Sequence, residues 1–319
     1  MKKLIALVLT LAMVFAFAAP AIAEEPVTMT LALRGGTYAD VIEGCLEQFG
    51  AENNVKFEVL KLEEADLKSK IALDSINAEG AYDLCMVDGS WMAEFASNEM
   101  LANLSAMGYS FDEDVIPATT AISYWDGNIY LAPYYGNVTV LLYNKELVTA
   151  AGYTGDTIGS IDDILAICKA AQAAGKKGFI ARGDSANNFV VDFMPIMLSF
   201  GAQFLDADNK PTVNTEEFKA AMNCYLELLA TGDLEKKDDL IASVDTGAGA
   251  MGVGWPGWYQ PSPEKAADYT AITGKVSADS TAFNANVYGV WTIGVPANAK
   301  NPELSLKLLQ YLMDKDVQL

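Results

Sequence analysis

The stretch DGNIYLAPYYGNVTVLLYNKEL, residues 126–147, decides how this chain is organised. A turn leads into a short apolar strand at residues 129–131, and Pro133 is expected to stop it because proline lacks an N–H and fixes φ. A new β-rich run begins at residue 138. A strand, an aromatic and polar break and a second strand together predict a chain that leaves one lobe and enters another.

The break in this stretch carries the first candidate binding residues. Tyr134, Tyr135 and Asn137 follow Pro133, and between two lobes they are placed to enclose a small ligand.

Strand and helix patterns alternate along the rest of the chain, which predicts an α/β fold with largely parallel sheets. Ser160 and Asp163 form an expected helix-capping pair, and Gly175 is expected to end that helix. Strands are expected at residues 27–33, 55–60, 82–87, 178–181, 269–273 and 287–295, and helices at 38–49, 67–78, from 91, from 161, around 218–229 and from 302.

Both ends of the chain carry expectations. Residues 1–23 combine Lys2 and Lys3, an apolar run and a small-residue cleavage site, which predicts a secretory signal peptide. The alternative is a membrane anchor, for which the apolar run is short. No element is expected after Leu312, and the chain is interpreted as C-terminally truncated, without part of the second lobe.

The composition narrows the function classes. The net charge is −21, which opposes binding to nucleic acid or anionic lipid. Histidine is absent, so His-based triads and His metal sites are excluded. The four cysteines form no CxxC pair and are expected to be buried small apolar residues, with a disulfide left open. We expect no cofactor, no metal site and no catalytic residue.

A glycine- and alanine-rich strand before Trp255 introduces the strongest aromatic signal. Trp255, Trp258 and Tyr259 surround a Pro-Gly pair. Indole and phenol rings pack against the C–H face of a sugar ring, so these residues predict a stacking platform. The alternative for each is an ordinary core position.

Other candidate residues follow strands, where ligands bind in open α/β sheets. Asp88, Ser90 and Trp91 follow one strand, although Asp88 is also a candidate helix N-cap and Trp91 a candidate core residue. Arg34 and Tyr38 follow the first strand, with a plain turn as the alternative.

A third strand end carries Arg182 and Asp184, which are placed to grip vicinal hydroxyl groups or, alternatively, to pair with each other at the surface. Asn286 flanks an expected second crossing between the lobes and is a weaker candidate.

These motifs give the chain a family resemblance. Residues 126–147, the tryptophan loop, the strand YDLCMVDGSW and the ending VPANAKNPELSLKLLQYLM together resemble extracellular solute-binding proteins of family 1, the sugar-binding group that serves ABC importers. The resemblance implies the two-lobe type II periplasmic-binding-protein fold, with a mainly parallel sheet flanked by helices in each lobe. Lobe 1 would comprise residues 24–135 plus 289–319, and lobe 2 residues 136–288.

The implied function is capture of a carbohydrate or polyol by hinge closure and delivery to an ABC permease. The protein is expected outside the cytoplasmic membrane, periplasmic or at the cell surface, as a monomer without a nucleic-acid partner. Two alternatives stay open: a polyamine or other small organic solute on the same fold, and a secreted glycoside hydrolase using two carboxylates.

Overall fold

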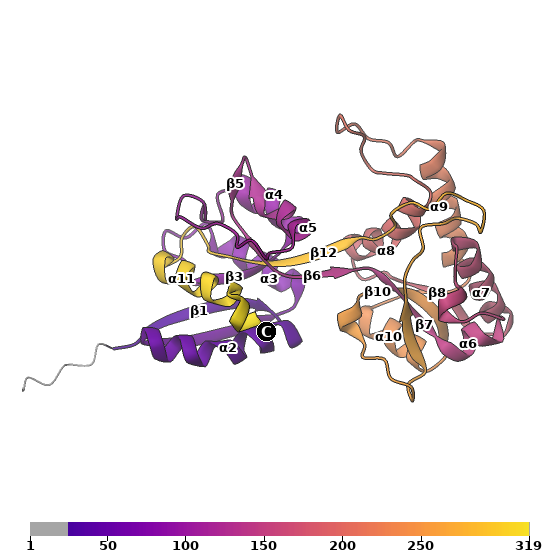
Figure 1. Cartoon of the computed structure of the whole chain (residues 1–319), viewed down its shortest axis with the longest axis horizontal. Helices are drawn as coiled ribbons and strands as arrows, with labels where there is room; N and C mark the ends of the chain where they lie inside the picture. Colours follow the sequence, from indigo (N-terminus) through magenta and orange to yellow (C-terminus); the bar gives the residue numbers. More distant parts are fainter. Residues whose placement is uncertain (1–24, 319) are drawn as a thin grey trace, which may run out of the picture. The chain divides into compact units, whose positions relative to one another are not determined.

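The computed structural model describes residues 25–318, so the expected signal peptide lies outside the described residues. The chain forms two compact α/β units (Figure 1). Unit 1 contains the described residues up to Tyr134 and from Thr292 onward, and unit 2 contains Tyr135–Trp291. The division falls inside strands β6 (Ala132–Val138) and β12 (Tyr288–Gly294).

Unit 1 is built on a sheet with the strand order β2-β1-β3-β12-β6. Strands β1 (Val27–Arg34), β2 (Val55–Leu62) and β3 (Leu84–Asp88) are parallel. The Thr292 hydroxyl of β12 donates to the Val87 carbonyl at 2.7 Å, and the Gly80 N–H donates to the Asn298 carbonyl at 2.7 Å. These two bonds show that β12 runs antiparallel to β3.

Helices cover the unit 1 sheet. The crossovers from β1 to β2 and from β2 back to β3 move in opposite directions, so right-handed connections place α2 (Thr37–Asn53) and α3 (Glu64–Asp74) on opposite faces. Helix α11 (Pro302–Met313) packs beside α2, with the rings of Phe49 and Tyr311 5.3 Å apart.

The stretch around Pro133 differs from its prediction. The expected strand at residues 129–131 is wrong in its bounds: β5 (Asn128–Ile129) overlaps it only at Ile129, and β6 runs through Pro133. The sheet tolerates this proline because β6 is an edge strand. Tyr134, Tyr135 and Asn137 therefore lie within a strand, and only Thr139 separates β6 from β7 (Val140–Asn144).

Unit 2 contains a mixed sheet with the order β11-β7-β10-β8-β9. Strand β7 is antiparallel to β10 (Gly249–Gly254) and β11 (Ala267–Thr270). Strand β8 (Lys177–Arg182) is parallel to β10 and β9 (Asp233–Glu235). The carboxyl ends of β8, β9 and β10 therefore lie at one edge of the sheet.

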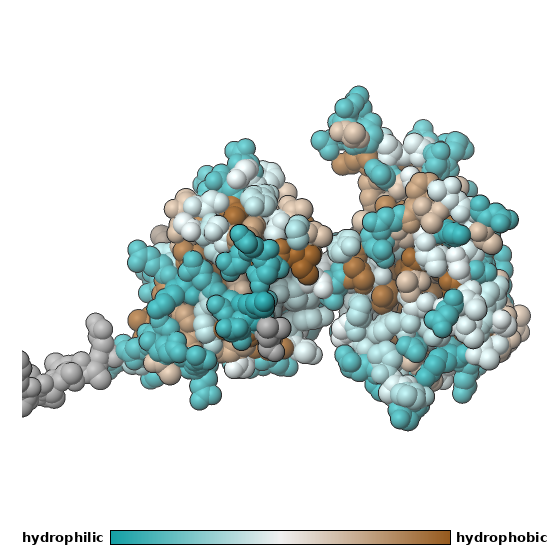
Figure 2. All heavy atoms as spheres, viewed as in Figure 1, coloured by the Kyte–Doolittle hydropathy of each residue, from teal (hydrophilic) through white to brown (hydrophobic). Residues whose placement is uncertain are grey.

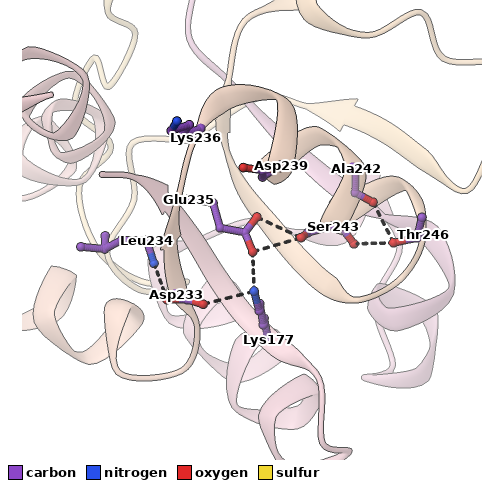
Figure 3. A pocket seen from close by; sticks show the side chains of 9 residues that line it. All are labelled: Lys177, Asp233, Leu234, Glu235, Lys236, Asp239, Ala242, Ser243 and Thr246. Atoms are coloured by element: carbon purple, nitrogen blue, oxygen red, sulfur yellow. Dashed lines mark hydrogen bonds and ion pairs between the residues drawn. The ribbon is translucent and has the colours of Figure 1, made fainter. Parts of the chain in front are cut away.

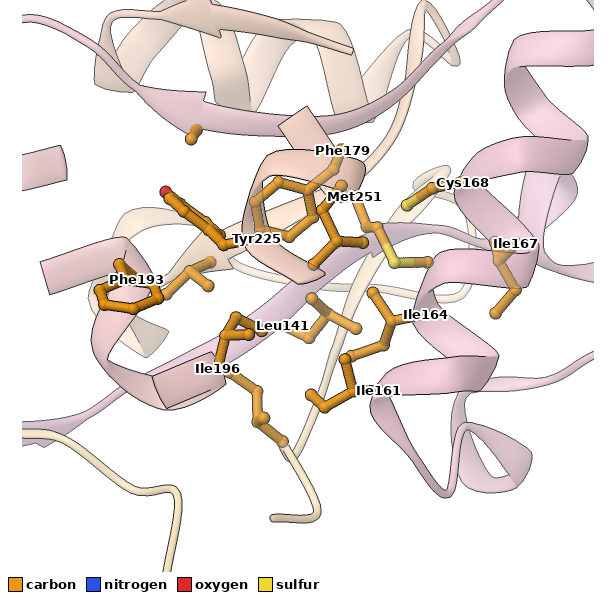
Figure 4. Packing of buried hydrophobic residues seen from close by; sticks show 14 of the residues in the cluster. Leu141, Ile161, Ile164, Ile167, Cys168, Phe179, Phe193, Ile196, Tyr225 and Met251 are labelled. Atoms are coloured by element: carbon orange, nitrogen blue, oxygen red, sulfur yellow. The ribbon is translucent and has the colours of Figure 1, made fainter. Parts of the chain in front are cut away.

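The alternation of side chains along β8 builds a core on each face of this sheet. Phe179 points into the larger cluster, where Figure 4 shows it beside Tyr225 and Met251. Ile180 points to the other face and packs with Leu240 of α10. The larger face is covered by α7 (Ile161–Ala173), α8 (Ala186–Ser199) and α9 (Glu216–Leu229), and the smaller by α10 (Lys237–Asp245).

Local sequence signals explain several boundaries. Ser160 caps α7 by accepting from the Asp163 N–H at 3.2 Å, and Gly175 follows the helix with φ +73°, as expected. Helices α8 and α10 were not predicted. The expectation of no element after Leu312 is wrong, because α12 (Lys315–Gln318) follows. The remaining short elements are η1 (Gly89–Trp91), α4 (Met92–Ser97), α5 (Pro117–Thr120), η2 (Ala121–Ser123), β4 (Tyr124–Trp125), α6 (Lys145–Ala150), η3 (Gly155–Thr157) and η4 (Pro256–Trp258).

The surface is rich in polar residues, and the expectation of buried cysteines is confirmed for two of the four. Hydrophilic residues are spread over the visible face of each unit, with residues of intermediate hydropathy and smaller hydrophobic areas between them (Figure 2). All four cysteines lie in the described residues and are free. Cys85 and Cys168 are buried, and burial raises the pKa of both thiols, whereas Cys45 and Cys224 are only partly buried.

Candidate functional site

The carboxyl edge of the unit 2 sheet brings two predicted residues together. Met251 pairs with Phe179, and the same register carried forward places Gly254 beside Arg182. After Gly254 the chain turns through η4, where the Trp258 N–H donates to the Trp255 carbonyl at 3.0 Å. This turn returns the Trp258 indole to the strand end, where the Arg182 guanidinium carbon lies 4.9 Å from the ring centroid.

Hydrogen bonds to helix α8 hold the Arg182 side chain in place. Its Nε atom donates to Asp192 Oδ1 at 3.0 Å, and its Nη2 atom donates to the same oxygen at 2.6 Å. Its Nη1 atom donates to Asn188 Oδ1 at 2.9 Å, and its backbone N–H donates to Asp192 Oδ2 at 2.8 Å. The Asp192 side chain is 0% exposed. Burial raises the pKa of this carboxyl, and the adjacent guanidinium opposes that shift.

The alternative of a mutual ion pair between Arg182 and Asp184 is wrong. Asp184 is exposed and accepts instead from Asn188 Nδ2 at 3.1 Å, while Arg182 pairs with Asp192. Sequence reasoning missed Asn188 and Asp192 because α8 itself was not predicted. The available signal was the spacing of four residues between them after the N-cap Ser185, which places both on one helix face.

The three predicted platform aromatics do not form a single surface. Trp258 is half-buried, and the Arg182 guanidinium lies over its ring. Trp255 is also half-buried and packs against Gly289, where an added Cβ would lie 2.7 Å from the indole Cη2. Tyr259 is buried, and its hydroxyl donates to the Asp245 carboxylate. Burial, followed by that hydrogen bond, raises the pKa of Tyr259 to about 12. The core alternative therefore describes Tyr259.

The carboxyl edge of the unit 1 sheet holds the candidates that follow β1 and β3. Arg34 ends β1 and pairs with Glu63 at 3.1 Å, a carboxylate that is 78% exposed. Gly36 has φ +87°, a conformation that favours glycine, and Tyr38 is half-buried in the first turn of α2. These features fit the plain-turn alternative as well as a binding role.

The residues after β3 have mainly structural surroundings. The Asp88 carboxylate accepts from the Ser90 N–H at 2.9 Å, as the N-cap alternative expects. Trp91 is 6% exposed, and its ring lies 5.7 Å from that of Phe95. Two aromatic residues four apart on a helical turn pack on the same side, so Trp91 is a core residue of unit 1.

The strands at the division carry the remaining candidates. Tyr134, Tyr135 and Asn137 are half-buried on β6, and burial raises the pKa of Tyr134 to about 12. Asn286 is exposed just before β12, and its N–H donates to Asn284 Oδ1 at 3.1 Å. The Thr139 N–H donates to the Val287 carbonyl at 3.0 Å, so the two connecting segments lie side by side there.

A separate hollow of about 520 Å³ lies between β9 and α10 (Figure 3). Three of its charged groups are bound to one another: Lys177 pairs with Glu235 and with Asp233, the latter at 3.2 Å. The Ser243 hydroxyl donates to Glu235 at 2.9 Å. The hydrogen bonds that Lys177 donates to Glu235 and Asp233 raise the pKa of Lys177. Within residues 25–318, no group of His, Cys, Asp or Glu side chains is arranged to hold a metal ion.

Comparison with known families identifies the chain. The family model described as bacterial extracellular solute-binding protein matches residues 33–319. The chain belongs to this family. The resemblance drawn from the sequence is thereby confirmed. Within the described part of the chain, no helix has the length and apolarity needed to cross a membrane.

Individual relatives of this solute-binding protein are distant. The probable amino-acid ABC transporter periplasmic-binding protein y4oP of Sinorhizobium fredii is 21% identical and is covered over 73% of its length by 95% of this chain. Among solved structures, maltose-bound MalE3 of T. maritima is 22% identical with a TM-score of 0.74, the match covering 92% of this chain and 78% of that one. A solute-binding protein from Agrobacterium radiobacter K84 in complex with ribitol is 22% identical with a TM-score of 0.76, covering 92% and 77%. These likenesses confirm the predicted α/β, type II periplasmic-binding-protein fold.

Proposed function

We propose that this solute-binding protein binds an uncharged carbohydrate or polyol outside the cytoplasmic membrane and delivers it to an ABC permease, without making or breaking a bond. The observation that carries the proposal is Trp258, a half-buried indole held at the carboxyl edge of the unit 2 sheet. An indole face packs against sugar C–H groups, and this sheet edge is where α/β proteins bind ligands. Distant relatives of the same fold are described with maltose and with ribitol.

The residues proposed to surround the ligand come from each unit's strand ends and from the connecting strands. Trp258 and Trp255 offer aromatic surface, and Asp184, Asn137 and Asn286 offer polar groups. Arg182 and the buried Tyr259 are proposed to support this aromatic surface. Unit 1 would contribute Arg34, Tyr38, Asp88, Ser90 and Tyr134, with Tyr135 on the adjoining strand and Trp91 as packing support.

The ion pairs of the two arginines favour the hypothesis that the ligand is uncharged. Arg34 and Arg182 are the only arginines in the sequence, and each already binds a carboxylate, Glu63 and Asp192 respectively. Recognition of a ligand carboxylate commonly uses a bidentate arginine. The net charge of −21 also opposes anionic ligands such as uronic acids.

An amino acid is the second candidate ligand, because the Sinorhizobium relative is described as a probable amino-acid binding protein. That function would require a group for the α-carboxylate. Arg182 would have to leave the fully buried Asp192 to provide it, which is energetically costly. Arg34 pairs with the exposed Glu63 and could leave it at little cost, so an amino-acid ligand would depend on Arg34.

Capture by hinge closure is part of the proposal. The chain passes between the units through β6 and β12, two segments that lie side by side at Thr139 and Val287, so bending is expected there. A ligand favours the closed state only as far as it binds that state more tightly. X-ray scattering should report a smaller radius of gyration with ligand, and an unchanged radius at saturation would contradict closure.

A thermal-shift screen tests the ligand class directly. Neutral sugars and polyols are compared with uronic acids, amino acids and polyamines at matched concentrations. A ligand at about 100 times its Kd stabilises the folded state by about 2.7 kcal/mol, which raises the Tm measurably. We expect neutral sugars or polyols to give the stabilising hits. A shift confined to amino acids, polyamines or uronic acids would contradict the proposal.

A further inference from the structure

We propose that Arg182 is a positioning residue for the binding platform: it fixes the orientation of the Trp258 indole and does not itself bind the ligand. This inference rests on the proposed function for its effect on affinity. Its structural basis, the contact between Arg182 and Trp258, lies wholly within unit 2.

The Trp258 ring is constrained at its edge and over its face. An added Cβ at Gly254 would lie 3.4 Å from the indole Cε3, so the ring edge rests against the glycine at the end of β10. The guanidinium carbon of Arg182 lies 4.9 Å from the ring centroid. A guanidinium over an indole is attracted by the ring's negative face, and its flat shape also stacks well.

The hydrogen bonds of Arg182 are directed away from solvent. Nε and Nη2 donate to Asp192, Nη1 donates to Asn188, and the arginine side chain is 6% exposed. A group that grips ligand hydroxyls would need N–H donors facing the ligand. The Arg182 guanidinium carbon instead lies over the Trp258 ring, so we infer that its contribution to binding is transmitted through the indole.

Helix α8 makes this support rigid. Asp192 is fully buried and also accepts the Arg182 backbone N–H at 2.8 Å, which ties the helix to the last residue of β8. The Arg182 Nε atom also donates to Asp192 Oδ2 at 3.3 Å, while Nη2 donates to Oδ1, so the pair is bidentate. Such a pair holds the arginine plane in one geometry. Lysine at position 182 would keep the charge beside Asp192 but would lose both the fork and the stacking surface.

A double-mutant cycle separates positioning from direct contact. The variants are Arg182→Lys, Trp258→Ala and the two combined, with Lys169→Met as the control, because Lys169 pairs with exposed Glu227 on the outer helices of the same unit. Calorimetry measures the Kd for the sugar or polyol that gives the largest thermal shift. We expect Arg182→Lys to weaken binding about fivefold, the scale of one cation–π contact. In the Trp258→Ala background the same change should alter the Kd by less than about twofold.

A second readout does not depend on the ligand. The indole N–H resonance of Trp258, assigned by its loss in Trp258→Phe, should shift in Arg182→Lys and stay in place in Lys169→Met. Asn188→Ala, which removes one hydrogen bond to Arg182 and keeps the ion pair, should give a smaller shift and serves if Arg182→Lys does not fold.

The outcomes are separable. Additive losses in the cycle would show that Arg182 touches the ligand, and an unmoved Trp258 resonance in Arg182→Lys would show that it does not position the ring. Either result overturns the inference. If no sugar or polyol binds the wild-type protein, the proposed function fails, and the resonance still decides whether Arg182 orients Trp258.

Discussion

Arg34 in unit 1 and Arg182 in unit 2 occupy equivalent places, each the last residue of a parallel strand, yet their surroundings differ. Arg34 pairs with Glu63, which is 78% exposed, whereas Arg182 pairs with Asp192, which is 0% exposed. The Arg182 guanidinium also lies over the Trp258 ring. Each arginine ends a strand and is followed by glycine in the sequence. Their surroundings nevertheless differ, because the partner carboxylate is exposed in one case and buried in the other.

The largest expected difference between the two arginines is in folding stability. Asp192→Ala leaves the Arg182 charge buried without its partner and should lower the free energy of unfolding by about 3–5 kcal/mol. The matched change Glu63→Ala removes an exposed pair and should cost less than about 1 kcal/mol. Denaturant titration of both variants measures the difference, and equal losses would remove the distinction drawn between the two sites.

The next expected difference concerns the tryptophans. Trp258→Ala should weaken binding of the neutral ligand at least about tenfold, or about 1.4 kcal/mol, because the platform is lost. Trp91→Phe, which changes a core residue of unit 1, should lower stability by about 1 kcal/mol and change the Kd by less than about twofold. Calorimetry and thermal melting check both. If Trp91→Phe weakened ligand binding more than Trp258→Ala, the platform would lie in unit 1, and its assignment to unit 2 would be wrong.

The smallest expected effect separates Tyr259 from its neighbour Trp258. Burial raises the pKa of Tyr259 to about 12, above the ordinary value of about 10. The stabilisation that its neutral hydroxyl provides is therefore fully present below pH 10 and is lost as the pH rises through about 12.

The Tm of the wild-type protein should exceed that of Tyr259→Phe near neutral pH, by an amount equivalent to about 1 kcal/mol. This difference should shrink above about pH 10. A constant difference up to about pH 12 would mean that the hydroxyl does not titrate as its surroundings indicate.

The sequence predicts the α/β layers well where the periodicity is clear, as at β1 and α2, and where a side-chain cap adds to it, as at α7. It fails at α8, where Pro195 inside the helix and the adjacent Val190 and Val191 obscure the helical pattern. Because α8 was not predicted, Asp192 was not placed on a helix, and the sequence did not predict it as the buried partner of Arg182. Pro133 misled for a different reason, because only the strand order shows that β6 is an edge strand.

The candidate binding residues show the same division between pattern and packing. A loop containing Trp255, Trp258 and Tyr259 is visible in the sequence, but which ring is exposed depends on contacts with residues distant in the chain. Trp255 packs against Gly289, the Tyr259 hydroxyl donates to the Asp245 carboxylate, and Arg182 lies over Trp258. Composition alone gives no access to such pairings.

The most direct test is a crystal structure of the protein with the neutral sugar or polyol that stabilises it most. The ligand ring or carbon chain should lie against the Trp258 indole, with Arg182 still bound to Asp192 and making no contact with the ligand. A ligand located away from Trp258, or one whose carboxylate has drawn Arg182 from Asp192, would contradict the account.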